Sequence, residues 1–198
     1  YPTLDQKWAL LVAASSGWMN YRHQADVLQM YQILRQQGYD DDHIVLIMED
    51  DIANNDQNPH KGVVQVRPNG ENVYQNVVVD YHTSELEPQD IQRILCGEKS
   101  ERLPEVIGAD SDDNVLFFWS GHGEPNQMLW LDREEGFTQE LAQTTFKAME
   151  ARKTYRKLLC LIEACYSGSV MSATEGIPGI LAMTAANPTE TSKADLYS

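Results

Sequence analysis

Short apolar runs alternate with longer amphipathic or polar stretches along this chain. Five runs have the length and continuity of strands buried on both faces: 8–14, 44–48, 114–119, 158–162 and 179–186. Between the first two, apolar residues such as Val27, Tyr31 and Leu34 recur at three- and four-residue intervals, which predicts a helix over 22–38. A strand, helix, strand order of this kind predicts a parallel, right-handed crossover.

The remaining pattern continues this alternation. It predicts helices over 87–95 and 137–155, and a short strand or edge segment at 128–131. The polar stretch 50–80 is too long for a structureless connection, so we expect it to be ordered and to include a short hairpin within 62–79. Together these elements predict an α/β three-layer sandwich, with helices on both faces of a mostly parallel sheet.

Length and charge narrow the classes of function. At 198 residues we expect a single domain over 1–198, and its end soon after the fifth predicted strand leaves room for a missing C-terminal part beyond Ser198. The net charge of −15 and the absence of a Lys/Arg cluster exclude a nucleic-acid partner. No apolar run is long enough for a membrane segment, and no signal peptide is visible. The acidic loops lack EF-hand spacing, so we expect no metal and no other cofactor.

Two of the apolar runs end in a residue with reactive chemistry. The run 114–119 stops at Ser120-Gly121-His122-Gly123, and the run 158–162 leads into Glu163-Ala164-Cys165. Ligands and catalytic groups of open parallel sheets gather at the carboxyl ends of the strands. If these two strands are neighbours, His122 and Cys165 meet, as a thiol nucleophile and an imidazole base require. Of the other cysteines, Cys160 should be a buried, inert thiol, and Cys96 an ordinary surface or loop thiol.

These motifs resemble the legumain family of asparaginyl endopeptidases, within the caspase-like clan of cysteine peptidases. The resemblance runs from about Trp8 to Ser192. It is carried by Ser120-Gly121-His122-Gly123, Glu163-Ala164-Cys165-Tyr166-Ser167-Gly168-Ser169, Gly17-Trp18-Met19-Asn20-Tyr21-Arg22-His23-Gln24-Ala25-Asp26, Arg67-Pro68-Asn69-Gly70 and Thr184-Ala185-Ala186-Asn187-Pro188.

The resemblance implies a catalytic set. Cys165 would be the nucleophile, and His122 the general acid/base that protonates the leaving amine. Asn20 matches a family asparagine thought to orient that histidine. The backbone N–H groups of Gly123 and Cys165 would form the oxyanion hole. Because Asn is a favoured N-cap residue, Asn20 also fits an ordinary helix cap.

The resemblance also implies a specificity pocket, formed by Arg22, Glu163 and Ser192, with His23 close to it. Residue alternation on a strand puts Glu163 on the same side as Cys165. A carboxylate paired with a guanidinium recognises both ends of an asparagine amide, because one group accepts from the NH2 and the other donates to the carbonyl. We therefore expect cleavage after Asn, and after Asp only at lower pH. Arg22 also fits a surface position at a helix N-terminus.

Two positions depart from the family pattern. Ser120 stands where legumains usually carry an aspartate, which bears on peptide ligation, and Tyr166 replaces an acidic residue beside the nucleophile. Two other interpretations stay open: a transamidase of the same family, which passes the acyl group to an amine, and a caspase-like module that binds proteins without catalysis.

The expected partners are a peptide or protein substrate and, if the protein is a zymogen that is cut, a second chain from proteolytic processing. We expect a secreted or periplasmic protein if the source is bacterial, and a lysosomal or vacuolar one if it is eukaryotic.

Overall fold

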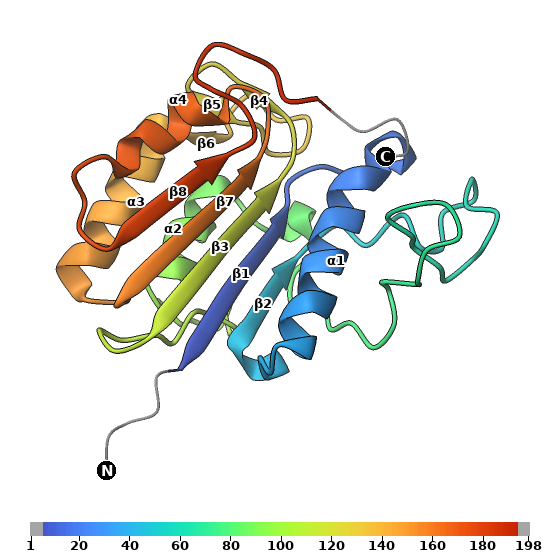
Figure 1. The fold of residues 1–198 in the computed structure, drawn as a ribbon, viewed down its shortest axis with the longest axis horizontal. Helices are drawn as coiled ribbons and strands as arrows, with labels where there is room; N and C mark the ends of the chain where they lie inside the picture. The colour runs from blue at the N-terminus through green and yellow to red at the C-terminus, as the bar shows by residue number, and fades with distance from the viewer. Residues whose placement is uncertain (1–5, 194–198) are drawn as a thin grey trace.

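The structure is a computed structural model that describes residues 6–193. Its main sheet has five parallel strands in the order β2-β1-β3-β7-β8 (Figure 1). The strands are β1 (Lys7–Ala13), β2 (Ile44–Ile47), β3 (Asn114–Ser120), β7 (Lys157–Glu163) and β8 (Ile180–Thr184). All five predicted strands are confirmed, with bounds that differ from the prediction by at most two residues.

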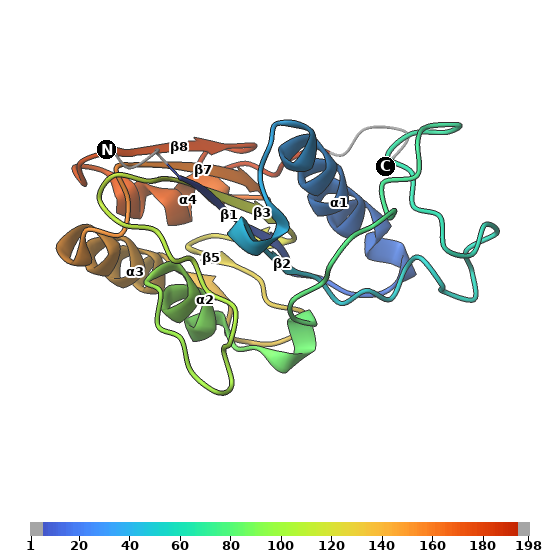
Figure 2. The same cartoon turned by 90° about the horizontal axis from the view of Figure 1, so that it is seen from below.

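Helices pack on both faces of this sheet. Figure 2 shows α1 (Tyr21–Gln36) on one face, and α2 (Pro88–Leu95) and α3 (Gln139–Arg152) on the other. The short helix α4 (Ser167–Met171) packs against α3. The predicted three-layer α/β sandwich is thus confirmed. Four single-turn 3-10 helices join the larger elements: η1 (Trp18–Asn20), η2 (Asp41–His43), η3 (Thr83–Glu85) and η4 (Ser172–Thr174).

The helix predicted over 137–155 is shorter at both ends. Its first two residues instead form β6 (Phe137–Thr138), which joins β4 (Gly123–Glu124) and β5 (Gln127–Met128) in a small antiparallel sheet. The Thr138 hydroxyl accepts a hydrogen bond of 3.1 Å from the Leu141 N–H. Thr138 is thus the N-cap of α3, which begins at the next residue. Lys153, with φ of 56°, ends the helix. Figure 1 shows the small sheet beyond the carboxyl ends of β3 and β7.

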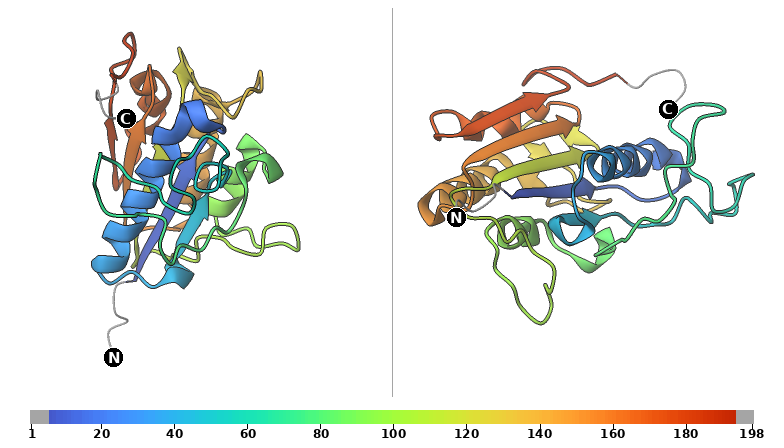
Figure 3. Two further views of the ribbon diagram at one scale, coloured as in Figure 1. Left: turned by 90° about the vertical axis from the view of Figure 1, so that its right-hand side faces the viewer. Right: turned by 60° about the horizontal axis from the view of Figure 1, so that its bottom comes forward.

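The connection between β2 and η3 is ordered, as expected, but it contains no strand, so the predicted hairpin is wrong. In this connection, side-chain amides bond the backbone groups that would otherwise pair between strands. Asn58 Nδ2 donates to three carbonyls, those of Ile52, Ala53 and Val63, and Asn72 Oδ1 accepts from the Val64 N–H at 3.0 Å. Because these amides satisfy the backbone locally, no second strand is needed. Figure 3 shows this connection extending past the edge of the sheet that carries β2 and α1.

The prediction that all five strands are buried on both faces is wrong for β8. Leu181 and Met183 are 61% and 58% exposed, and in β7 the side chains of Leu159 and Leu161 are only half-buried. α1 packs mainly on β1 and β3 and also on β2, while in Figure 1 β7 and β8 carry no helix on that face within residues 6–193.

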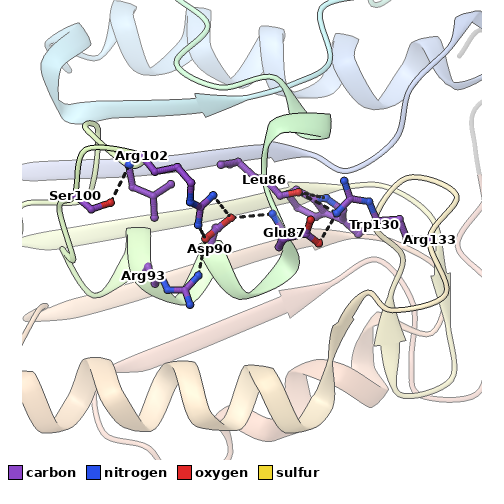
Figure 4. Close-up of polar contacts among 9 residues, drawn as sticks. Leu86, Glu87, Asp90, Arg93, Ser100, Arg102, Trp130 and Arg133 are labelled. Carbon is purple, nitrogen blue, oxygen red and sulfur yellow. Dashed lines mark hydrogen bonds and ion pairs between the residues drawn. The ribbon is translucent and has the colours of Figure 1, made fainter.

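A buried carboxylate anchors α2 (Figure 4). Asp90 has a side chain with no exposed surface, and it accepts hydrogen bonds from Arg93 at 2.7 Å, from Arg102 and from the Glu87 N–H at 2.8 Å. Burial alone raises the pKa of this carboxyl, but the hydrogen bonds from Arg102, the Glu87 N–H and Arg93 outweigh it and hold the pKa below its ordinary value. The beginning of α2 is therefore fixed electrostatically.

Candidate active site

The alternation of side chains between the two faces of β3 and β7 sets the position of the candidate site. Phe118 on β3 and Leu161 on β7 pack in the apolar cluster under α1. Two residues later on each strand come Ser120 and Glu163, which are register partners and therefore share that face. The apolar surface under α1 thus gives way to polar groups at the carboxyl edge of the sheet.

His122 and Cys165 follow Ser120 and Glu163 by two residues each, so they occupy corresponding positions just beyond neighbouring strands. The Gly121 N–H donates to the Glu163 carbonyl at 3.0 Å, which keeps the two chains together past the last register pair. Gly123 approaches so closely that an added Cβ would lie 1.9 Å from the Cys165 carbonyl oxygen. Only glycine fits at this position. The structure therefore brings the segments of His122 and Cys165 side by side at one edge.

Asn20 holds the imidazole of His122. Its Oδ1 lies 2.6 Å from His122 Nε2, while its Nδ2 donates to the Ser16 carbonyl at 2.9 Å. Because the amide NH2 already faces a carbonyl, Oδ1 must be the acceptor toward the ring, so Nε2 carries the proton. Burial and the nearby Arg22 lower the pKa of His122, with Asp132 opposing them. The neutral ring then keeps an unprotonated Nδ1.

Cys165 sits at a sharp turn from β7 into α4. The next residue, Tyr166, has φ of 54°, a left-handed conformation that a non-glycine residue rarely adopts. The segment after β8 folds back over this turn, since the Tyr166 N–H donates to the Glu190 carbonyl at 2.9 Å. This returning segment puts the Ser192 hydroxyl 3.9 Å from Cys165 Sγ. The cysteine is half-buried and its sulfur faces the same space as Ser192.

Glu163, the residue two positions before Cys165, interacts with both Arg22 and Ser192. Burial raises the pKa of the Glu163 carboxyl, while a hydrogen bond from Ser192 and the charge of Arg22 work against that rise. Glu163 thus interacts with each of the other two predicted pocket residues, and all three side chains are partly exposed. A carboxylate and a guanidinium in one partly exposed space can satisfy an amide at both its oxygen and its nitrogen.

His23, the fourth predicted pocket residue, is almost fully buried, with 3% of its surface exposed. Its Nδ1 lies 2.5 Å from Ser15 Oγ, and its ring packs edge-on against the His122 ring at 4.8 Å between centroids. Burial, Arg22 and His122 together lower the pKa of His23 to about 3. A neutral His23 therefore supports the His122 ring from below.

Asp26 had no predicted role in the site, and it contacts Ser120, one of the two positions that depart from the family pattern. The Ser120 hydroxyl donates to Asp26 Oδ2 at 2.8 Å, so a second carboxylate lies under the site. The sequence could have indicated Asp26, because it follows Arg22 by four residues in the predicted helix and therefore shares the same helix face.

The three cysteines differ in environment. Cys160 is fully buried in β7, as predicted, and burial raises its pKa far above the ordinary value. The prediction of a surface or loop thiol is wrong for Cys96, which is 7% exposed at the end of α2, because this turn packs into the main apolar core. Burial raises its pKa to about 11. Only Cys165 among the described cysteines has a partly exposed side chain.

Comparison with known proteins shows the family to which this chain belongs. The model of the family described as the peptidase C13 family matches residues 7–198. The chain belongs to the peptidase C13 family. Legumain from Rattus norvegicus is 39% identical over 194 residues, which cover 96% of this chain and 44% of the relative. The C13 fold is caspase-like, which agrees with the parallel sheet and its two helical layers.

Two other C13 relatives give a similar result. The vacuolar-processing enzyme delta-isozyme from Arabidopsis thaliana is 37% identical, over 94% of this chain and 41% of the relative. The hemoglobinase from Schistosoma mansoni is 38% identical, over 98% of this chain and 48% of the relative. The resemblance to the legumain family is thereby confirmed. The chain spans less than half the length of these relatives.

Proposed function

We propose that this protein is a cysteine endopeptidase that hydrolyses peptide bonds after asparagine, with Cys165 and His122 as its catalytic pair. The observation that supports the proposal is the close approach of Gly123 to the Cys165 backbone, just beyond the ends of two neighbouring strands. Membership of the peptidase C13 family and the similarity to legumain support it.

In the proposed reaction, Cys165 Sγ attacks the carbonyl carbon of the scissile bond, and the carbonyl oxygen becomes an oxyanion. The N–H groups of Gly123 and Cys165 stabilise that oxyanion, and each such donor typically contributes about 2.7 to 4 kcal/mol. The thiol proton passes through His122 to the leaving amine as the C–N bond breaks. Water then hydrolyses the thioester, and releases the free acid and the thiol.

Asn20 serves this reaction as a positioning residue. The Oδ1 of Asn20 accepts a hydrogen bond from the Nε2–H of His122 and so fixes the tautomer protonated at Nε2. The Nδ1 of that tautomer is free to carry the transferred proton. The edge-on contact with His23 limits rotation of the same ring.

Specificity for asparagine follows from Arg22 and Glu163. The guanidinium donates to the amide oxygen of the substrate, and the carboxylate accepts from its NH2 group. Ser192 bonds Glu163 and lies 3.9 Å from Cys165 Sγ, so it links the proposed pocket to the nucleophile. An aspartate would meet the like charge of Glu163, so its bond is cleaved only at lower pH.

A covalent probe with an asparagine side chain tests the proposal in the full-length protein. We expect labelling of the wild type, loss of labelling in Cys165→Ala, and retained labelling in the matched control Cys96→Ala. An assay for free peptide acid against transfer to an added amine separates hydrolysis from transamidation. A folded wild type that neither takes the probe nor cleaves asparaginyl peptides overturns the proposal and favours a binding module.

Two further expectations accompany the proposal. We propose a lysosomal or vacuolar location if the source is a eukaryote, because one relative is named a vacuolar-processing enzyme, and a secreted or periplasmic location if it is a bacterium. Within residues 6–193, every helix is too short or too polar to cross a bilayer. Processing into a second chain is tested by comparing the intact masses of wild type and Cys165→Ala, since self-cleavage requires the nucleophile. The predicted chain end at Ser198 lies outside the described residues.

A further inference from the structure

A second carboxylate, that of Asp26, lies close enough to Glu163 and Arg22 of the proposed specificity pocket to interact with both. Asp26 is one helical turn after Arg22 on α1, and its Oδ2 accepts a hydrogen bond of 2.8 Å from the Ser120 hydroxyl. Ser120 is the register partner of Glu163, so the hydrogen bond fixes Asp26 against the strand position beside the pocket carboxylate. The reaction proposed above uses neither Asp26 nor Ser120.

The surroundings of Asp26 contain few other charges. β1 contributes apolar side chains to this face of the sheet, among them Leu11 and Ala13. β3 contributes Ser120, β7 contributes Glu163, and α1 itself contributes Arg22, whose charge acts on both carboxylates. With every group ionised, two carboxylates share one guanidinium, and this group of residues has a net charge of about −1.

We propose that Asp26 is a specificity-determining residue of this pocket, whose negative charge adds to that of Glu163 in rejecting an acidic substrate side chain, so that its protonation weakens this rejection. The inference rests on the proposed endopeptidase function. When Asp26 is ionised, it neutralises part of the Arg22 charge and repels an aspartate of the substrate. When it is protonated, Arg22 and Glu163 alone remain charged, and the pocket becomes neutral overall.

The electrostatics of the site agree with this role. Burial raises the pKa of Asp26 to about 6, with the Ser120 hydrogen bond lowering it, Glu163 raising it and Arg22 lowering it. Asp26 therefore changes its charge well above the pKa near 3.9 at which the carboxyl of a substrate aspartate titrates. The two events are separable in one pH profile.

The test is the ratio of kcat/KM for an Asp peptide to that for the matched Asn peptide, measured between pH 4.5 and 7.5. In the wild type we expect the ratio to rise about tenfold as the pH falls through 6, which corresponds to a coupling of one pKa unit. In Asp26→Asn, which keeps an acceptor for Ser120, the ratio at pH 7 should be higher than in the wild type, and it should rise less as the pH falls to 5, because only Glu163 is left to respond. A merely structural role for Asp26 would not produce this flattening.

Two further variants sharpen the test. Ser120→Ala removes a hydrogen bond that stabilises the ionised form, so the rise in the ratio should move to higher pH. Asp80→Asn is the matched control, because burial also raises the pKa of Asp80, to about 7, but its Oδ2 bonds the Leu46 N–H on β2. That control should keep the wild-type profile.

The outcomes separate this inference from the function on which it rests. Wild-type profiles in both Asp26→Asn and Ser120→Ala, with normal asparaginyl cleavage, overturn the role of Asp26 alone. If Asp26→Asn does not fold, Ser120→Ala decides by itself, and an unshifted profile overturns the inference. A wild type that cleaves neither peptide overturns the proposed function instead.

Discussion

Gly123→Ala is the substitution for which the structure predicts the largest effect from the smallest change. The added Cβ would lie 1.9 Å from the carbonyl oxygen of Cys165, 3.0 Å from its carbonyl carbon and 3.2 Å from its nitrogen. All three contacts are with backbone atoms, so no side-chain rotation relieves them. The chain after His122 must move away from the chain at Cys165.

The size of this movement sets the expected loss of activity. Reaching even 3.0 Å from the oxygen requires a separation of about 1.1 Å, and a misplacement of about 1 Å can cost 100-fold in rate. The movement also displaces two proposed oxyanion donors, each worth about 10²- to 10³-fold in kcat. We therefore expect kcat/KM for an Asn peptide to fall at least about 100-fold, mostly through kcat.

Steady-state kinetics with a fluorogenic Asn peptide, together with thermal unfolding followed by circular dichroism, measures both consequences. The control is Gly176→Ala, where an added Cβ meets nothing within 4 Å, so only the backbone strain from its φ of 77° remains. That control should lose stability but keep kcat. A folded Gly123→Ala protein within threefold of the wild-type kcat/KM would refute the proposed juxtaposition of the two strand ends.

Three further predictions concern groups around this centre. Asn20→Ala should lower kcat about 10-fold or more with little change in KM, because the imidazole loses its fixed tautomer; an unchanged kcat contradicts the positioning role. Asp90→Ala should lower the free energy of unfolding by about 2 to 3 kcal/mol at pH 7, less than for a fully buried ion pair because both arginine partners are half exposed. Since the Asp90 pKa is lowered on folding, this loss should shrink as the pH falls below 4, and urea titrations at two pH values measure it. A generic thiol reagent at pH 7 should modify Cys165 well before Cys96 and Cys160, whose pKa values are raised by burial; mass spectrometry of the peptides reports the order, and early modification of Cys96 would contradict its burial.

Strand positions and the sheet edge were predictable because they depend on continuous apolar runs. The run 114–119 and the run 158–162 could be recognised from hydrophobicity alone, and the residues after them necessarily lie at one edge if the strands are parallel neighbours. The register that puts Ser120 opposite Glu163 confirms that arrangement. The placement of His122 and Cys165 at corresponding positions follows from it.

Other features depend on contacts that periodicity does not encode. The amides of Asn58 and Asn72 order the 50–80 connection without strands, although its turn signals fit a hairpin. The exposure of Leu181 depends on which part of the sheet α1 covers, and an apolar strand looks the same covered or not. Cys96 is buried because the last turn of α2 packs into the core, which a short helix pattern does not reveal.

The beginning of α1 links these parts of the site. Asn20 is the N-cap residue of α1, but its side chain makes no capping hydrogen bond, and bonds His122 and the Ser16 carbonyl instead. The interpretation of Asn20 as an ordinary cap is therefore wrong. The charge of Arg22 likewise acts on both His122 and Glu163. One helix end thus contacts the imidazole and supplies the cation of the proposed pocket, so a change that shifts α1 should alter rate and specificity together.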